Sequence, residues 1–320
     1  MPIDISLVIP TYNSATNLGE LYERIAVTCQ TQLKMSFETI WVDDHSTDNT
    51  WQVLCNLQAR YPQQVAIVRL SKNFGQHNAT LCGIRQAQGN ILVTIDDDLQ
   101  MLPENIKELY QKYQETECDL VYAVFNNEQQ GKIRQIARNI FAIVQRWEGI
   151  DKGKGSSFRL MNRKLYQKLI NNTHGFVFID EICLWHTQMI EFVELKLYPS
   201  KRINQKSTYN MATLVGLSVN LIVFSSNLPL RIMTLTGFSA SFISFLAILF
   251  LLYKKIFKNV LIGYTSIMIS IFFSTGIILF CLGIVGEYLN KLYRIQKNMP
   301  IYSIDKIKSE LWVKICAHLN

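Results

Sequence analysis

A strand, a polar turn and a helix follow one another four times in the first part of the chain. The apolar strands are expected at residues 5–9, 39–42, 65–70 and 91–95, each followed by a helical pattern. Strands that alternate with helices predict an α/β fold with an open, mostly parallel sheet. Because no G-x-G-x-x-G motif follows the first strand, a dinucleotide-binding domain is disfavoured.

Polar side chains follow each of these predicted strands directly. They are Asn13, Asp44, the segment 72–76 and the segment 96–100. The carboxyl ends of parallel strands meet at one edge of a sheet, and ligands bind there in open α/β folds. The sequence therefore predicts a ligand site built from these four turns.

The strand at 91–95 runs into three adjacent carboxylates, Asp96, Asp97 and Asp98. Two like charges ~4 Å apart repel by about 4 kcal/mol at an effective dielectric constant near 20, which indicates a cation between them. Alternate residues of an extended segment point to the same side, so we expect Asp96, Asp98 and Gln100 to bind Mg²⁺ or Mn²⁺, which in turn holds a diphosphate. The alternative is a solvated acidic loop before a helix that begins near Pro103.

The composition narrows the partners. The 320 residues carry a net charge of +7, with basic residues concentrated between 131 and 206. This favours phosphorylated substrates or an anionic lipid surface, and no nucleic-acid motif accompanies it. Seven cysteines without a C-x-x-C pair indicate reduced thiols facing the cytosol, and histidine spacing gives no sign of zinc. The N-terminus shows no signal peptide.

Between residues 126 and 210 the pattern changes. Residues 133–147 repeat apolar side chains at helical spacing, with basic side chains on the other face. This segment is either an ordinary core helix or a basic helix over the site, near lipid headgroups. An edge strand is expected at 189–198, and a basic loop at 199–209.

Two long segments without charge, 232–252 and 260–285, follow a less apolar segment at 211–231. The first is about 31 Å long as a helix, enough to cross a bilayer core of ~30 Å. We expect a catalytic domain at 1–210, an interfacial helix at 211–231, a two-helix transmembrane hairpin and a cytosolic tail at 286–320. Buried helices of a soluble protein are the alternative.

Seven motifs carry a resemblance to a known family. They are VIPTYN at 8–13, VDDHSTDNT at 42–50, NFGQHNA at 73–79, DDDLQ at 96–100, the loop with Arg202, Ser207 and Tyr209, PLR at 229–231 and GEYLNKLY at 286–293. In this order the chain resembles glycosyltransferase family 2 with the GT-A fold. It is most similar to the membrane-bound polyprenyl-phosphate glycosyltransferases, such as undecaprenyl-phosphate formamido-arabinose transferases, bactoprenol glucosyl transferases and dolichol-phosphate mannose synthases.

The resemblance implies roles for individual residues. For the nucleotide and sugar it implies Pro10, Tyr12, Asn13, Asp44, Lys72, Asn73, Gly75 and Asp97. For the diphosphate and acceptor it implies Arg134, Arg202, Lys206, Ser207 and Tyr209. The metal ligands are those named above, and Asp98 and Arg202 are the main catalytic candidates. Two alternatives remain: Asp44 as a simple helix cap, and Arg202 with Lys206 as a solvated face.

The chain departs from the family pattern at two places. The family often has Gly-Asp-Phe/Tyr before the strand that contains Phe158, and its Asp is a proposed base, whereas this chain has the segment 153–157 there. Asp151 and Asp180 are the nearest acids by sequence. Residues 143–147 only superficially match the Q-x-x-R-W motif of processive synthases, so a polymerising synthase is disfavoured.

The implied activity is metal-dependent, inverting transfer of a sugar from a nucleotide sugar, UDP-linked by expectation, to polyprenyl phosphate for cell-envelope glycans. The implied location is the bacterial inner membrane, with two crossings, the catalytic domain in the cytosol where nucleotide sugars are found, and contact with membrane lipid. A homo-oligomer, with a tetramer as the family's example, is also implied. The alternatives are a non-catalytic membrane scaffold that binds nucleotide sugar and a transferase of the same fold acting on another acceptor.

Overall fold

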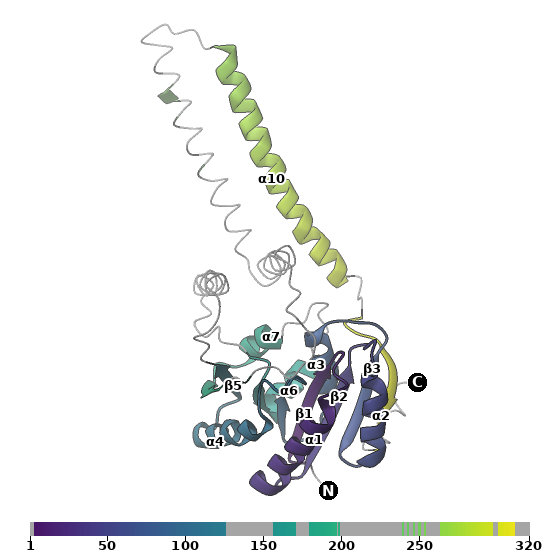
Figure 1. Cartoon of the computed structure of the whole chain (residues 1–320). Helices are drawn as coiled ribbons and strands as arrows, with labels where there is room; N and C mark the ends of the chain where they lie inside the picture. The colour runs from purple at the N-terminus through teal and green to yellow at the C-terminus, as the bar shows by residue number, and fades with distance from the viewer. Residues whose placement is uncertain are drawn as a thin grey trace. The chain divides into compact units, whose positions relative to one another are not determined.

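The chain forms two compact units in the computed structural model (Figure 1). The first consists of Met1–Gln135, Lys152–Lys206 and Met299–Asn320, and the second of Ile136–Asp151 and Ser207–Asn298. The structure describes residues 3–125, 156–170, 179–196, 198, 263–296 and 300–310, with the single positions 239, 242, 246, 249, 250 and 253. The strands of this described part all belong to the first unit.

The first unit is built on one mixed sheet. Its described strands are β1 (Ile5–Thr11), β2 (Phe37–Asp43), β3 (Val65–Leu70), β4 (Ile91–Thr94), β5 (Leu120–Phe125), β6 (Arg159–Asn162), β7 (Ile190–Leu195) and β8 (Ile304–Lys308). They lie in the order β7-β5-β6-β4-β1-β2-β3-β8. The central strands β4, β1, β2 and β3 are parallel, whereas β6 is antiparallel to both of its neighbours.

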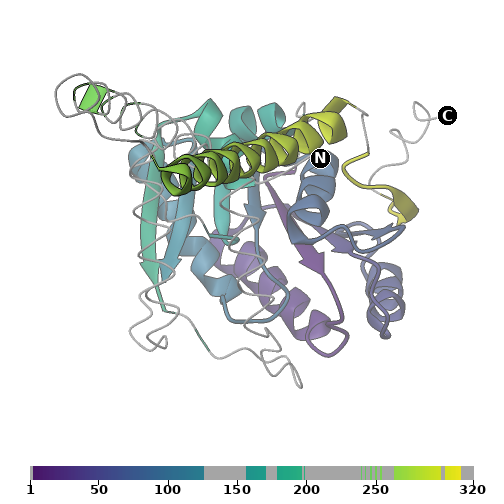
Figure 2. The ribbon, with the colours of Figure 1, turned by 90° about the horizontal axis from the view of Figure 1, so that it is seen from above.

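Helices cover both faces of this sheet (Figure 2). They are α1 (Leu18–Val27), α2 (Thr50–Arg60), α3 (Gln76–Gln86), α4 (Ile106–Thr116), α6 (Arg163–Ile170) and α7 (Ile179–His186). Side chains alternate along a strand, so Ile5 and Leu7 of β1 pack with α1, α2 and α4, and Val8 packs with α3, α6 and α7. Two apolar layers of core therefore enclose the sheet.

The predicted α/β fold with a mostly parallel sheet is confirmed. The first four strands lie within two residues of their predicted bounds. The helical pattern expected after the first strand is present: α1 ends at Val27, and a π-helical segment, Thr28–Leu33, continues it. The fourth strand ends at Thr94, one residue early. The predicted edge strand at 189–198 is β7, at the end of the sheet.

The residues expected to form a separate C-terminal tail join the sheet instead. Strand β8 pairs antiparallel with β3, and the Ser71 N–H donates to the Ser303 carbonyl at 2.8 Å. Just before β8, the Tyr302 hydroxyl accepts a hydrogen bond from Nη1 of Arg85 on α3 at 3.2 Å. The expectation of a tail at 286–320 outside the catalytic domain is therefore wrong for this segment, because it covers the open edge of β3.

The described part of the second unit is mainly α10 (Tyr264–Gln296). This helix covers most of the second predicted crossing and continues into the predicted tail. Several large apolar side chains on it are exposed, including Phe273 and Leu282. No helix in the described part of the chain has the length and apolar composition that crossing a membrane requires. The segment 211–231 and most of 232–252 lie outside the described residues.

Candidate active site

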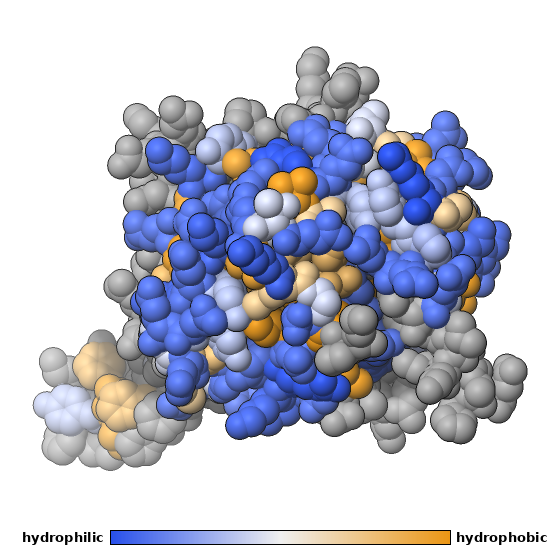
Figure 3. Space-filling model, turned by 90° about the horizontal axis from the view of Figure 1, so that it is seen from below, coloured by the Kyte–Doolittle hydropathy of each residue, from blue (hydrophilic) through white to orange (hydrophobic). Residues whose placement is uncertain are grey.

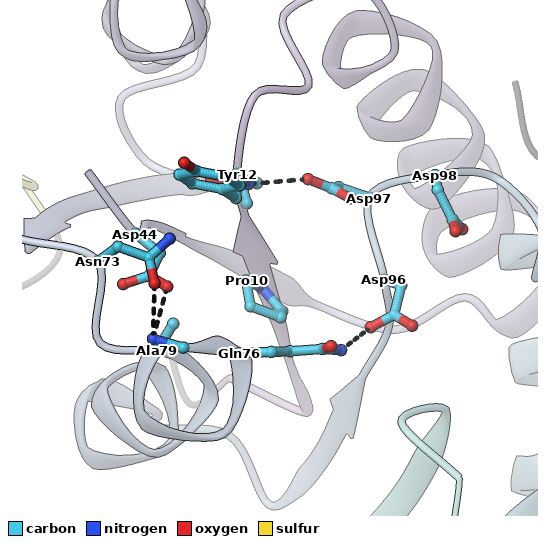
Figure 4. A pocket seen from close by; sticks show the side chains of 11 residues that line it. Pro10, Tyr12, Asp44, Asn73, Gln76, Ala79, Asp96, Asp97 and Asp98 are labelled. Carbon is cyan, nitrogen blue, oxygen red and sulfur yellow. Dashed lines mark hydrogen bonds between the residues drawn. The ribbon is translucent and has the colours of Figure 1, made fainter. Parts of the chain in front are cut away.

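A polar cavity of ≈ 250 Å³ lies where β1, β2, β3 and β4 end (Figure 4). It is lined by Pro10, Thr11, Tyr12, Asp44, Asn73, Gly75, Gln76, Ala79, Asp96, Asp97 and Asp98. These residues meet because the carboxyl ends of parallel strands share one edge of the sheet. The structure thus brings together the four polar turns that the sequence predicts as a ligand site.

The opposite end of the strands has a different character. A hollow of ≈ 910 Å³ is lined there by residues just before β1, β2 and β3, among them Ile3, Ser36 and Gln64. The face seen from below carries apolar side chains in its middle, with hydrophilic ones around them (Figure 3). Among the residues described to line these two spaces, four carboxylates lie in the cavity at the carboxyl ends of the strands, whereas the hollow at the opposite end has one, that of Glu310.

The acidic segment is a turn and not an extended row. After β4 ends at Thr94, the chain turns at Asp97 and Asp98, and Leu99 has a positive φ of 57°. The Asp97 carboxylate points to Tyr12, whose N–H donates to Oδ2 at 3.3 Å (Figure 4). The expectation that Asp96, Asp98 and Gln100 form one row is wrong, because the period of two holds only within a strand.

Asp96 is held from two sides. Gln76 Nε2 donates to its Oδ1 and Ser157 Oγ donates to its Oδ2, both at 2.6 Å. Burial raises the pKa of Asp96 to about 6; the Ser157 hydrogen bond opposes this shift, and the charges of Asp98 and Asp97 add to it. A nearby cation would stabilise the ionised form of this carboxyl group.

Asp44 joins two of the turns around the cavity. Its Oδ1 accepts from the Phe74 N–H at 2.7 Å and its Oδ2 from the Gly75 N–H at 2.8 Å. Burial raises the pKa of Asp44, and these two hydrogen bonds oppose that shift. Gly75 has a φ of +89°, a conformation that favours glycine. Asp44 therefore sets the shape of the 73–75 loop, in addition to any contact with a ligand.

Three of the residues predicted to bind the nucleotide, the sugar or the metal lie outside the described lining of the cavity. Asn13 bridges to the turn after β2, since its Oδ1 accepts from the Thr47 N–H at 2.9 Å. Lys72 lies 5.0 Å from the centre of the Phe74 ring. Gln100 donates its N–H to Asp98 Oδ1 at 3.0 Å. All three support the loops that form the cavity.

The residues of the cavity fit a divalent cation. The described lining contains four carboxylates, those of Asp44, Asp96, Asp97 and Asp98, and no basic side chain. Such oxygen donors suit Mg²⁺ or Mn²⁺. Within the described residues, no three His, Cys, Asp or Glu side chains converge on one metal position. Mg²⁺ commonly binds through one or two carboxylates with substrate phosphates and water, which Asp96 and Asp98 can satisfy.

Asp180 does not line the cavity. Its Oδ1 lies 2.5 Å from Arg159 Nη1 and accepts a hydrogen bond from the Tyr122 hydroxyl at 2.7 Å. Arg159 also donates from Nε to Thr94 Oγ1 at 3.2 Å. These contacts are typical of a structural ion pair, and a base role for Asp180 stays a prediction.

The sequence assigned no function to the two residues whose side chains donate hydrogen bonds to Asp96, Gln76 and Ser157. Gln76 belongs to the predicted polar segment 72–76, and Ser157 lies in the segment that replaces the acid of the family pattern. The departure before Phe158 is the one signal that could have pointed to Ser157. The remaining predicted residues, Asp151, Arg134, Arg202, Lys206, Ser207 and Tyr209, lie outside the described residues.

Comparison with known proteins assigns the chain to a class of enzyme. The family model "Glycosyl transferase family 2" matches residues 6–183. The chain therefore belongs to glycosyltransferase family 2, and it is a glycosyltransferase.

Its relatives match over nearly the whole chain. It is 34% identical to the uncharacterized glycosyltransferase sll0501 of Synechocystis, over 98% of this chain and 96% of the relative. It is 30% identical to the undecaprenyl-phosphate 4-deoxy-4-formamido-L-arabinose transferase of Pseudomonas fluorescens, over 95% and 90% respectively. A crystal structure of glucosyl-3-phosphoglycerate synthase from Mycobacterium tuberculosis is also similar, with 19% identity and a TM-score of 0.49, over 69% of this chain and 76% of that one.

Proposed function

We propose that this glycosyltransferase moves a sugar from a nucleoside-diphosphate donor, UDP-linked by expectation, to the phosphate of a polyprenyl phosphate such as undecaprenyl phosphate. The observation that carries the proposal is the position of Asp96, Asp97 and Asp98 in the cavity at the carboxyl edge of the sheet. Relatives named undecaprenyl-phosphate 4-deoxy-4-formamido-L-arabinose transferase, which match over nearly the whole chain, support the acceptor class.

The reaction is a single displacement. A phosphate oxygen of the acceptor forms a bond to the anomeric carbon on the side opposite the donor diphosphate. The bond from that carbon to the diphosphate oxygen breaks, and the nucleoside diphosphate leaves with the electron pair. The anomeric configuration is therefore inverted.

Asp96 and Asp98 are the residues that would hold Mg²⁺ or Mn²⁺ beside the donor diphosphate. When bound, the cation neutralises negative charge on the departing diphosphate. Tyr12, Asp44 and the 73–75 loop form the part of the cavity that would receive the nucleoside. The basic residues Arg134 and Arg202 are proposed to bring the two anionic substrates together.

A strong base is not required for this acceptor. The second pKa of a phosphate monoester is near ~6, so the attacking oxygen is already anionic near neutral pH. The position of Asp180 supports this simpler chemistry, because its carboxylate is paired with Arg159 and does not belong to the described lining of the cavity.

The acceptor is a lipid, so the proposal includes a membrane location. The uncharged segments 232–252 and 260–285 support two crossings of the bacterial inner membrane, with segment 211–231 at its surface. The catalytic unit would face the cytosol, where nucleotide sugars are found. A homotetramer is the proposed assembly, by resemblance to the family.

The test uses the purified full-length chain in detergent. Labelled nucleotide sugars are each incubated with undecaprenyl phosphate and either Mg²⁺ or Mn²⁺, and label in the lipid fraction is measured. We expect transfer from one donor, and its loss in Asp98→Ala. Asp305→Asn, which changes an exposed carboxylate on β8, serves as the control. Equal transfer by Asp98→Ala and wild type would contradict the role of the acidic turn.

The same assay separates the two alternatives. Nucleotide binding that needs the metal, with no transfer from any donor, favours a non-catalytic scaffold. Transfer to diacylglycerol or to a protein but not to undecaprenyl phosphate favours a transferase with another acceptor.

A further inference from the structure

The strongest unexplained feature of the cavity is the fixed orientation of Asp96. Its two oxygens accept hydrogen bonds from different parts of the fold, one from Gln76 at the start of α3 and one from Ser157 just before β6. An ionised carboxylate offers about four lone-pair positions, so two of them remain for another partner. The two donors therefore fix the orientation of the Asp96 carboxylate and leave lone pairs with which it can bind a cation.

Ser157 is itself held in place by buried groups. Thr94 Oγ1 donates to the Ser157 carbonyl at 2.5 Å, and the same Thr94 oxygen accepts from Arg159 Nε at 3.2 Å. Thr94 and Arg159 are also paired residues in the register of β4 and β6. Arg159 is 2% exposed and its charge is balanced by Asp180. A chain of contacts therefore runs from the buried ion pair to the cavity.

We propose that Ser157 and Gln76 are positioning residues that orient the Asp96 carboxylate toward a divalent cation bound with the donor diphosphate. The inference builds on the proposed function, because it assigns residues to the metal site of that function. Partners that orient a metal ligand typically change metal affinity or activity 10–100-fold when they are removed. Neither residue is expected to touch the sugar or the acceptor.

Metal binding measured without turnover tests the proposal. Mn²⁺ is titrated into the full-length protein with UDP present, and free Mn²⁺ is followed by its electron paramagnetic resonance signal. We expect Ser157→Ala and Gln76→Ala each to raise the Kd for Mn²⁺ about 10-fold. Ser157→Thr, which keeps the hydroxyl, is expected to bind within about 3-fold of wild type.

The chain offers a matched control one residue away. Ser156 Oγ accepts from the Phe158 N–H at 3.2 Å, and Ser156→Ala therefore removes a hydroxyl that belongs to a local turn. This variant is expected to bind Mn²⁺ as wild type does. Gln76 is exposed, so Gln76→Ala reads the effect even where Ser157→Ala fails to fold.

The outcomes separate this inference from the proposed function. Unchanged Mn²⁺ affinity in both Ser157→Ala and Gln76→Ala overturns the inference, as does absence of Mn²⁺ binding by the wild type. The expected loss of affinity, in a protein that transfers no sugar to any polyprenyl phosphate, supports the inference and overturns the proposed function.

Discussion

Arg159 and Asp180 form an ion pair with 2.5 Å between Nη1 and Oδ1, and the Arg159 side chain is only 2% exposed. The pair links α7 to β6, which is the neighbour of β4 in the sheet. The acidic turn follows β4. Removing one partner of a buried pair leaves the other charge without compensation, which is costly.

We therefore expect Asp180→Ala to lower the free energy of unfolding by about 3 kcal/mol. Thermal melting of the purified protein measures this. Glu191→Ala removes half of the more exposed pair with Lys112, at 3.7 Å, and is expected to cost less than about 1 kcal/mol. Equal stability of the two variants would argue against a structural role for Asp180. If Asp180 is instead the base, Asp180→Asn will lose kcat even at a temperature at which the variant is fully folded.

Gly75→Ala is expected to weaken nucleotide binding more than it affects folding. A Cβ at this position meets no atom within 4 Å, but the φ of +89° strains any residue with a side chain. With a ψ of 156° as well, this conformation costs a residue with a side chain about 1–3 kcal/mol, and a shift of the loop held by Asp44 relieves the strain. The expected result is a higher KM for the nucleotide sugar and little change in melting temperature. Gly263→Ala, also with open space around it, is the matched control.

Acid is expected to destabilise the first unit through His77. Burial, together with the charge of Arg159, lowers the pKa of His77 to about 4, and Asp180 opposes the shift. The unfolded chain therefore binds the proton more readily, at a pKa of about 6.5, than the folded chain does. Stability should fall as the pH drops from about 6.5 to about 4 and change no further below that range for this group.

The comparison of wild type with His77→Gln isolates this effect. Melting temperatures at pH 7.5, 6 and 5 should converge or cross as the pH falls, because the variant lacks the titrating group. Parallel curves for the two proteins across this range would show that His77 does not contribute.

Tyr302 is expected to hold β8 against the sheet. Its hydroxyl accepts from Arg85, and the Arg85 guanidinium lies 5.4 Å from the centre of its ring. Tyr302→Phe removes the hydrogen bond alone and should cost about 1 kcal/mol, and Tyr302→Ala should cost about 2 kcal/mol because the ring contact is lost too. Hydrogen exchange of the β3 amides, which should quicken in Tyr302→Ala, reports whether β8 separates. Unchanged exchange would contradict this role.

The first four strands were predictable because each is an apolar run that ends in polar turn residues. That pattern also told which side chains would meet, since parallel strands share an edge. β5 received no prediction, although its residues, 120–125, are as apolar as those of the other strands. β8 could not be recognised, because Asp305, Lys306 and Lys308 give it no apolar alternation and only its partner β3 defines it as a strand.

The orientation of the cavity side chains was less predictable. The expected row of Asp96, Asp98 and Gln100 depended on a strand that ends at Thr94. Ser157 lies just before β6, which pairs antiparallel with β4, and it is 61 residues away from Asp96 in the sequence. Such a contact depends on tertiary pairing, which local sequence does not determine.

The pairing of β3 with β8 has a consequence for the path of the chain. The stretch 207–298 belongs to the second unit, whereas the residues before it and β8 after it both belong to the first unit. The chain therefore leaves the first unit at residue 206 and returns to it after residue 298. If this stretch crosses a bilayer, it must do so an even number of times. An odd number of crossings would place β8 and its partner β3 on opposite sides.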